Sequence, residues 1–160
     1  MNMRTGIGYD VHPYAEGRAF ILGGVEISHH QGLKGHSDAD VLSHAIADAV
    51  LGALGEPDIG HWFPPTDASI AGISSLKILE KVASIAAAKG ATIENVDSTV
   101  IAEAPKVNPH RDAMKAKIAA ALGITADRVG VKATTNERLG FVGREEGVAA
   151  MAVACVSFKS

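Results

Sequence analysis

Aromatic side chains, cysteine and long apolar stretches are all scarce in this sequence. Aromatics make up 4% of the residues, and Cys155 is the one cysteine, which excludes an internal disulfide and a cysteine-based zinc site. No apolar stretch approaches the roughly 20 residues of a membrane span. The net charge is −3 and basic runs are absent, so we expect no nucleic-acid polymer as a partner. Strand-like residues begin within a few positions of Met1, so we expect no targeting segment and a cytoplasmic protein.

The length and the distribution of turn residues predict a single domain over residues 1–160. A hydrophobic content of 47%, mostly aliphatic, is sufficient for one core. The expected strands span residues 4–9, 20–27, 92–102, 128–134 and 147–159, and the expected helices span residues 39–54, 75–89 and 109–123. Because a pure β-α-β alternation is absent, we predict an α+β fold with a mixed sheet covered by helices on one face.

Turn and capping residues set the expected boundaries of these elements. Gly23 and Gly24 indicate a bulge or bend inside the second strand. Ser37 or Asp38 is the expected cap of the first helix, and Ser75 that of the second.

Residues 56–74 contain too many prolines and glycines for regular structure and are expected to form a long loop. Two interpretations remain open. The loop is either a solvated surface segment with Trp62 and Phe63 tucked under it, or a lid that contacts substrate hydroxyls through its backbone and Asp58.

The last expected strand is apolar on both alternating faces between Val148 and Val156. Helices can cover one face, so the other face also needs a covering layer. We expect this layer to be the sheet of another subunit, which favours a cyclic homo-oligomer.

Asp10 and His12 lie one residue apart in an extended segment, so both side chains can reach one ion. His44, in the next expected helix, can close the site. Two imidazoles and a carboxylate suit a catalytic zinc with an open fourth position, although manganese, cobalt or iron also fit such ligands. The alternative is a surface aspartate and two unrelated histidines among the seven of the chain. Asp40 and Asp48 share a helix face with His44, and either could accept its second ring N–H.

The segment 35–40 leads directly into the helix that carries His44. Backbone N–H groups at the helix start, together with His36 and Ser37, could receive an anion. Asp38 and Asp40 would compete for the same donors, so the alternative is that they only cap the helix.

Near the C-terminus, residues 132–137 follow a strand with two threonine hydroxyls, a lysine and Glu137. This combination suits a diphosphate chelated through magnesium, with Glu137 as a hard oxygen ligand. Residues 104–106 end the central strand and offer backbone groups and one cation. Neither segment is a P-loop or a Rossmann fingerprint, and each is also compatible with a purely structural role.

The sequence resembles the 2-C-methyl-D-erythritol 2,4-cyclodiphosphate synthase family of the non-mevalonate isoprenoid pathway. The segments that carry the resemblance are GIGYDVH at 6–12, GGV at 23–25, GLKGHSDADVLSHAIADAVLGA at 32–53, DIGHWFPPTD at 58–67, NVDSTVIAEAPK at 95–106 and VKATTNERLGFVGREEGVA at 131–149. They follow one another in the family's order along nearly the whole chain, which makes the resemblance specific.

The resemblance implies a lyase that converts 4-diphosphocytidyl-2-C-methyl-D-erythritol 2-phosphate into 2-C-methyl-D-erythritol 2,4-cyclodiphosphate and CMP. It implies zinc, or another divalent transition metal, at Asp10, His12 and His44, and magnesium or manganese at the substrate diphosphate through Glu137. It also implies a homotrimer with sheets packed around the three-fold axis and active sites between subunits. The alternatives are a zinc-dependent phosphohydrolase that uses the same triad, and a non-catalytic trimer that binds an isoprenoid diphosphate.

The resemblance also assigns the remaining site residues. His36 and Thr135 match positions credited with transition-state stabilisation. The positions for the methylerythritol phosphate end are His36, Ser37, Asp58, Ile59, Gly60, Phe63, Pro64, Pro65, Thr66 and Asp67. Those for cytidine diphosphate, supplied by the neighbouring subunit, are Ala102, Glu103, Ala104, Pro105, Lys106, Val107, Asn108, Ala133, Thr134, Thr135, Asn136 and Glu137. Phe141 and Arg144, with Gly140, match a conduit on the trimer axis that can hold an isoprenoid diphosphate.

Overall fold

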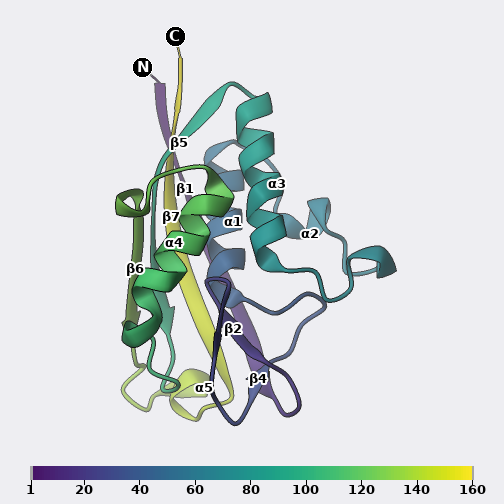
Figure 1. The fold of residues 1–160 in the computed structure, drawn as a ribbon, viewed down its shortest axis with the longest axis vertical. Helices are drawn as coiled ribbons and strands as arrows, with labels where there is room; N and C mark the ends of the chain where they lie inside the picture. Colours follow the sequence, from purple (N-terminus) through teal and green to yellow (C-terminus); the bar gives the residue numbers. More distant parts are fainter. Residues whose placement is uncertain (1, 160) are drawn as a thin grey trace.

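A five-stranded mixed sheet organises the computed structural model, which describes residues 2–159 (Figure 1). Its strands, in spatial order, are β4 (Gly32–Leu33), β1 (Asn2–Ala15), β7 (Gly147–Phe158), β5 (Ala91–Ile101) and β6 (Val129–Thr134). Strands β5 and β6 are parallel, and the other neighbours are antiparallel. The mixed sheet predicted from the sequence is therefore confirmed.

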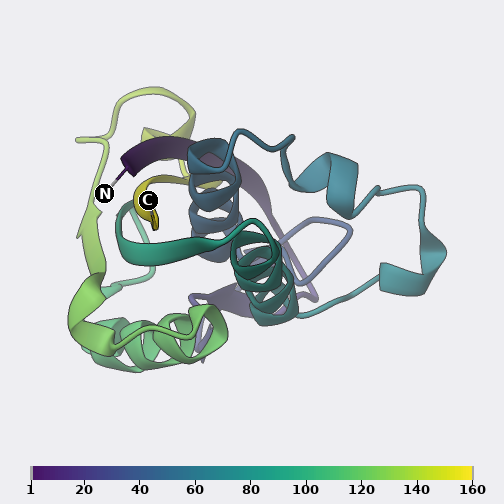
Figure 2. The same ribbon diagram turned by 90° about the horizontal axis from the view of Figure 1, so that it is seen from above.

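Three long helices lie on one side of this sheet, as the view from above shows (Figure 2). They are α1 (Val41–Ala53), α3 (Ser75–Ala88) and α4 (Arg111–Leu122). In α3 the buried residues Ile78, Leu79 and Val82 recur at helical spacing, and this apolar stripe faces the core. None of the helices in the described part of the chain has the length and apolar character needed to cross a membrane.

Helix α1 packs against β1 at two glycines. A Cβ atom at Gly8 would lie 1.8 Å from the carbonyl oxygen of Ala45, and one at Gly6 would lie 2.1 Å from that of Ala49. Any larger residue would force the helix away from the strand. This close approach brings α1 against the part of β1 that carries Asp10.

The other face of the sheet exposes apolar side chains in the single chain. These are Met3, Ile7, Tyr9 and Val11 of β1, and Met151 and Val153 of β7. Ile7 is 68% exposed and its register partner Val153 is 50% exposed. The last strand is thus apolar on both faces as expected, and only its helix-facing side is covered within the chain.

Two expectations about the connecting segments need correction. Residues 20–27 form a hairpin of β2 (Phe20–Leu22) and β3 (Val25–Ile27), not one bent strand. Gly23 and Gly24 both have positive φ and form its two-residue turn, which is the backbone geometry that glycine favours in tight hairpins. The loop 56–74 contains two short helices that the sequence did not predict, α2 (Ile59–Trp62) and η1 (Ala68–Ile70). The remaining short helices are η2 (Asn108–His110), η3 (Ala126–Arg128) and α5 (Gly140–Gly143).

Both expected helix caps are also wrong by one to three residues. The cap of α1 is Asp40, whose side chain accepts a hydrogen bond from the N–H of Ser43, rather than Ser37 or Asp38. The cap of α3 is Ser74, and Ser75 is the first helical residue. The side chains of Asp38 and Ser75 are therefore available for another role.

Candidate active site

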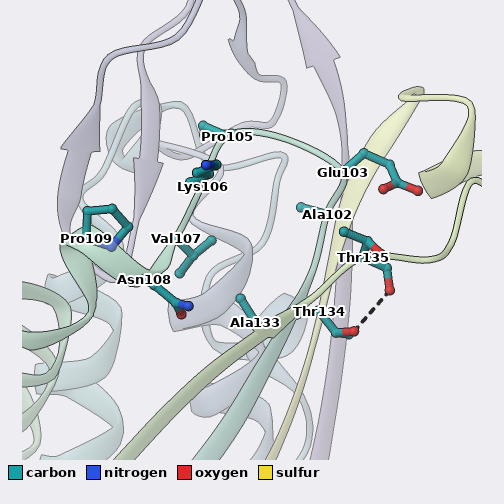
Figure 3. Close-up of a pocket in the computed structure, with 10 residues that line it drawn as sticks. All are labelled: Ala102, Glu103, Pro105, Lys106, Val107, Asn108, Pro109, Ala133, Thr134 and Thr135. Atoms are coloured by element: carbon teal, nitrogen blue, oxygen red, sulfur yellow. Dashed lines mark hydrogen bonds between the residues drawn. The ribbon is translucent and has the colours of Figure 1, made fainter.

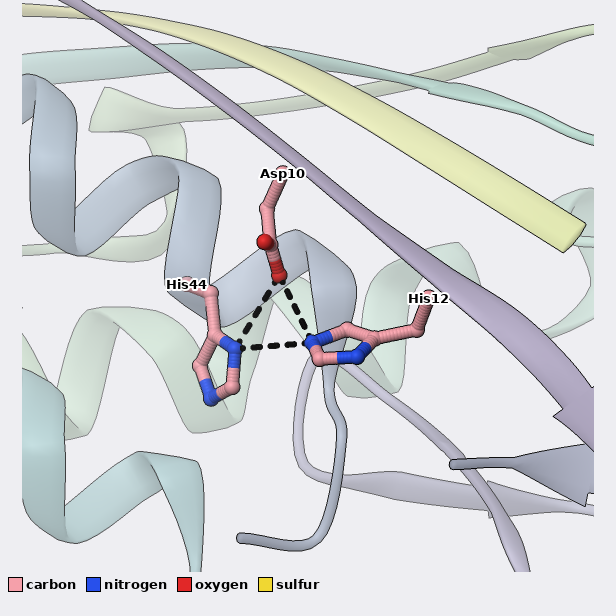
Figure 4. Close-up of side chains that lie close together, drawn as sticks. All are labelled: Asp10, His12 and His44. Carbon is pink, nitrogen blue, oxygen red and sulfur yellow. Dashed lines mark hydrogen bonds and ion pairs between the residues drawn. The ribbon is translucent and has the colours of Figure 1, made fainter. Parts of the chain in front are cut away.

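Asp10, His12 and His44 converge on one point, as predicted (Figure 4). Asp10 and His12 project from the same side of β1, and His44 reaches them from α1. Oδ2 of Asp10 lies 2.9 Å from Nε2 of His12 and 3.0 Å from Nδ1 of His44, and the two ring nitrogens are 3.2 Å apart. The chain therefore contains an aspartate–histidine–histidine group that could hold a metal ion.

Each imidazole makes a hydrogen bond through the nitrogen that faces away from this point. Nδ1 of His12 lies 2.9 Å from the carbonyl oxygen of Lys34, which can only accept, so Nδ1 carries the proton. Nε2 of His12 faces Asp10, and in the neutral ring its lone pair would be available to a cation. The outer nitrogen of His44, Nε2, lies 2.8 Å from the hydroxyl of Ser75 and 3.1 Å from that of Ser37.

The sequence left open whether Asp40 or Asp48 accepts the second N–H of His44, and in the structure neither does. Asp40 instead accepts hydrogen bonds from the N–H groups of Gly23 and Gly24, and Asp48 accepts one from the N–H of Ile59. The sequence spacing correctly placed both carboxylates on or at the start of α1, but they accept hydrogen bonds from backbone N–H groups instead of from His44.

The donor set fits a tetrahedral divalent cation. Donor separations of 2.9 to 3.2 Å are close to the spacing of about 3.3 Å expected for ligands about 2.0 Å from zinc. Burial opposes ionisation of Asp10, but hydrogen bonds from His12 and His44 lower the pKa of its carboxyl to about 2. Burial likewise opposes protonation of His12, yet the hydrogen bond with Asp10 raises its pKa above the ordinary value. The Asp10 carboxylate therefore stays ionised and offers one negative charge to a cation, which would have to displace the proton that His12 shares with it.

A cavity of about 280 Å³ opens above the triad. It is lined by Asp10, His12, His36, Ser37, His44, Ile59, Gly60, Phe63, Pro65, Ile70, Ile73 and Ile78. Six of the predicted positions for the methylerythritol phosphate end lie here, whereas Asp58, Pro64, Thr66 and Asp67 do not line it in the single chain. The apolar wall formed by Ile70, Ile73 and Ile78 was missed, because isoleucines in a loop and a helix carry no sequence signal for binding.

A second cavity, of about 480 Å³, lies at the ends of β5 and β6 (Figure 3). Its lining residues are Ala102, Glu103, Pro105, Lys106, Val107, Asn108, Pro109, Ala133, Thr134 and Thr135. Because β5 and β6 are parallel, the segments that follow them meet at one edge of the sheet, where the N–H of Ala102 donates to the carbonyl of Thr134 at 3.0 Å. The two segments predicted for cytidine diphosphate therefore lie side by side.

Glu137 lies beyond this cavity in a tight turn and is exposed. Glu137 and Arg138 both have positive φ, and the N–H of Glu137 is 3.2 Å from the hydroxyl of Thr135. The N–H of Arg138 donates to Oε1 of Glu103 at 2.7 Å, which ties the turn to the end of β5. Ala104, Asn136 and Glu137 do not line either cavity in the single chain.

The predicted axial residues lie near the start of β7. Phe141 of α5 is 39% exposed, and Arg144 forms an ion pair with Glu146 at 3.2 Å. This pair raises the pKa of Arg144.

The fold and the site define an α+β protein with a candidate catalytic metal group beside a ligand-sized cavity. Residues 3–157 match the YgbB family, and the chain belongs to this family. It is 54% identical to 2-C-methyl-D-erythritol 2,4-cyclodiphosphate synthase of Acaryochloris marina over 159 residues, or 99% of both chains.

Two solved structures share the fold over 99% of this chain. The bifunctional IspDF from Campylobacter jejuni matches with a TM-score of 0.95 and 40% identity, and the match covers 43% of that longer chain. A CDP complex of IspF from Plasmodium falciparum matches with a TM-score of 0.86 and 33% identity over 98% of its length. The family expected from the sequence is thereby confirmed.

Proposed function

We propose that this chain converts 4-diphosphocytidyl-2-C-methyl-D-erythritol 2-phosphate into 2-C-methyl-D-erythritol 2,4-cyclodiphosphate and CMP. The observation that carries the proposal is the convergence of Asp10, His12 and His44 beside a cavity, in a chain that is 54% identical to a synthase of this name. The CDP complex of a structural relative supports a cytidine-diphosphate-linked substrate. The activity would make the protein a phosphorus–oxygen lyase of non-mevalonate isoprenoid synthesis.

The reaction is an intramolecular substitution at phosphorus. An oxygen of the 2-phosphate attacks the β-phosphorus and forms a new P–O bond. The bond between the β-phosphorus and the oxygen that bridges it to the α-phosphate breaks, and CMP leaves. Because nucleophile and leaving group belong to one molecule, the protein mainly has to bend the substrate into line and exclude water. We assign the positioning of the 2-phosphate end to Ser37, the backbone of Ile59 and Gly60, and the loop that follows them.

Charge is the main obstacle, since two anionic phosphates must meet. A divalent cation bound by Asp10, His12 and His44 would screen this repulsion and polarise a phosphate oxygen. We assign zinc to this group because imidazole nitrogens suit a borderline-soft ion, and magnesium or manganese to the diphosphate through Glu137, a hard oxygen ligand.

His36 and the hydroxyl of Thr135 are assigned to stabilising charge on the transferring phosphoryl group. His36 lines the metal-side cavity, where its Nε2 lies 3.1 Å from the carbonyl oxygen of Asp67. Thr135 lines the second cavity together with Lys106, whose cation suits a diphosphate.

We further propose a homotrimer whose sheets pack around the three-fold axis. The exposed apolar face of β1 and β7 supports this assembly, because a monomer rarely leaves such a continuous patch in water. The two cavities of one chain share no lining residue, so a complete site would combine the metal-side cavity of one subunit with the cytidine-side cavity of its neighbour. Phe141 and Arg144 would then line the axial conduit for an isoprenoid diphosphate.

The test is phosphorus NMR of the purified protein with zinc, magnesium and the cytidylated substrate. Coupled cyclic-diphosphate resonances that appear together with CMP, and disappear when metal is chelated, would establish the synthase activity. Linear phosphates would point to a hydrolase instead. No reaction would overturn the catalytic proposal and leave ligand binding as the function to examine.

A further inference from the structure

Ser75 occupies a position that helix capping does not explain. It is fully buried at the start of α3, and the cap of that helix is the preceding Ser74. Its hydroxyl contacts Nε2 of His44 at 2.8 Å on one side and Oδ1 of Asp38 on the other. The N–H of Ser75 donates to Oδ2 of the same carboxylate at 2.9 Å. Asp38, Ser75 and His44 thus form a chain of hydrogen bonds that ends at a candidate metal ligand.

The direction of these hydrogen bonds follows from counting protons. A carboxylate can only accept, so the single proton of the Ser75 hydroxyl goes to Asp38. The hydroxyl oxygen is then left to accept, and the proton on its other side must belong to Nε2 of His44. With a proton held on Nε2, the ring directs Nδ1 toward Asp10 and His12, where its lone pair would be available to a bound cation (Figure 4).

Asp38 is itself anchored to the loop that borders the metal-side cavity. Its N–H donates to the carbonyl of Ile73 at 3.1 Å, and the N–H of Gly72 donates to the carbonyl of His36 at 2.8 Å. Two backbone hydrogen bonds therefore join the segment before α1 to the end of the loop 56–74, immediately before Ser75.

We propose that Asp38 and Ser75 are positioning residues that fix the ring orientation and tautomer of His44 for metal binding. The relevance of this positioning to catalysis rests on the proposed function, whereas its effect on metal binding does not. Outer partners of ligating histidines typically change metal affinity by about 10- to 100-fold when removed. Ser37, at 3.1 Å from the same nitrogen, remains as a weaker acceptor, so we expect a partial loss.

The experiment measures the zinc dissociation constant by chelator competition for Ser75→Ala and for the matched control Ser74→Ala. Ser74 is the exposed cap of the same helix, and its hydroxyl accepts a hydrogen bond from the N–H of Leu76 rather than contacting His44. We expect zinc affinity to fall about 10- to 100-fold in Ser75→Ala and to stay within about twofold in Ser74→Ala. Restoration of the affinity by Ser75→Thr, which keeps the hydroxyl, would support the positioning role.

Histidine ¹⁵N NMR of the zinc-free protein supplies a readout that general destabilisation would not mimic. The wild type should show His44 protonated at Nε2, and this signal should weaken in Ser75→Ala. If Ser75→Ala does not fold, Asp38→Asn tests the same point. The amide of the asparagine can donate to the Ser75 hydroxyl, and this would reverse the direction of the hydrogen bonds that run from His44 through Ser75 to residue 38. Unchanged zinc affinity and an unchanged tautomer in the folded variant would overturn the proposal. Neither readout needs substrate, so a wild type that makes no cyclic product would defeat only the proposed function.

Discussion

The hydroxyl of Ser75 lies 2.8 Å from Nε2 of His44, so the first turn of α3 contacts a candidate metal ligand carried by α1. With Asp10 and His12 on β1, the metal group therefore depends on three elements that are distant in the sequence. The contact also joins the site to the loop that borders its cavity, because Ser75 directly follows that loop.

Removing one metal ligand should abolish metal binding without unfolding the protein. His44→Ala is expected to lose zinc and nearly all synthase turnover while keeping the proposed trimer, because the ring is replaced at the edge of a cavity and the core of α1 is untouched. Metal analysis measures the bound zinc, the phosphorus NMR assay measures turnover, and light scattering measures the oligomeric state. Normal turnover in this variant would contradict the assignment of the site.

Zinc affinity should rise with pH because His12 must be neutral to bind. In the metal-free protein the hydrogen bond with Asp10, against the effect of burial, raises the pKa of His12 above its ordinary value. The pair therefore stabilises the fold below about pH 6.5, the ordinary pKa of histidine, and this contribution is lost as the pH rises through the raised pKa. The lowered pKa of Asp10, about 2, keeps its carboxylate charged throughout this range.

We expect the zinc dissociation constant to fall by about tenfold per pH unit below the raised pKa of His12, and to level off above it, because one proton is released on binding. Chelator competition between about pH 5.5 and 8.5 measures this. A dissociation constant that does not change over that range would contradict the expected proton competition.

A charge on the outer face of the sheet should prevent formation of the proposed trimer. Ile7→Asp places a carboxylate at a position that is 68% exposed in the single chain, so the subunit should fold while the apolar contact is lost. Light scattering should report a monomer, circular dichroism an intact fold, and the activity assay no product. Ala116→Asp, on the exposed side of α4, is the matched control and should remain trimeric. A trimeric Ile7→Asp variant would show that another surface mediates assembly.

Loss of the Asp40 carboxylate should destabilise the fold. Asp40 is fully buried and accepts hydrogen bonds from the N–H groups of Gly23, Gly24 and Ser43 and from the hydroxyl of Ser43. In Asp40→Ala these donors are unpaired, and we expect a loss of about 3 kcal/mol, or about 6–12 °C in Tm. Thermal unfolding after metal chelation measures it. Asp112→Ala, at an exposed carboxylate, should change stability by less than about 0.5 kcal/mol.

Glu137 should affect turnover but not the zinc group. Glu137→Gln removes the proposed magnesium ligand, and we expect turnover to fall by about 100-fold or more, since a catalytic cation contributes several kcal/mol. Zinc content should be unchanged, because Glu137 is not part of the metal-binding group formed by residues 10, 12 and 44. The control is Glu80→Gln on α3, an exposed carboxylate whose loss should leave turnover intact.

The convergence of the candidate metal ligands could be predicted from the sequence because alternate residues of an extended segment, here Asp10 and His12, point to one side. The partners of the ligands could not. Ser75 is 31 residues from His44, and its hydroxyl could be read equally well as a helix cap. Asp40 and Asp48 had the right helical spacing, but spacing does not reveal which backbone N–H groups a carboxylate will meet.

The long strands were predicted where hydrophobic residues alternate, although β1 spans residues 2–15 rather than 4–9. The two-residue strand β4 and the other short elements were missed where turn residues dominate. A pair of glycines such as Gly23 and Gly24 is compatible with either a bulge or a hairpin turn. Only the pairing of β2 with β3 in the structure shows that it is a hairpin turn. The short helices of the loop 56–74 have too few residues for a recognisable apolar period.

Gly8 limits how the metal group can change during evolution. Any side chain there would push α1 away from β1, and His44, which precedes Ala45 on that helix, would move away from Asp10 with it. The close packing of α1 on β1 at Gly8 thus sets the distance between His44 and Asp10, and with it the size of ion that the group could hold. A substitution at Gly8 would therefore widen the gap between the two elements and spread the candidate ligands apart, although Gly8 itself is not one of them.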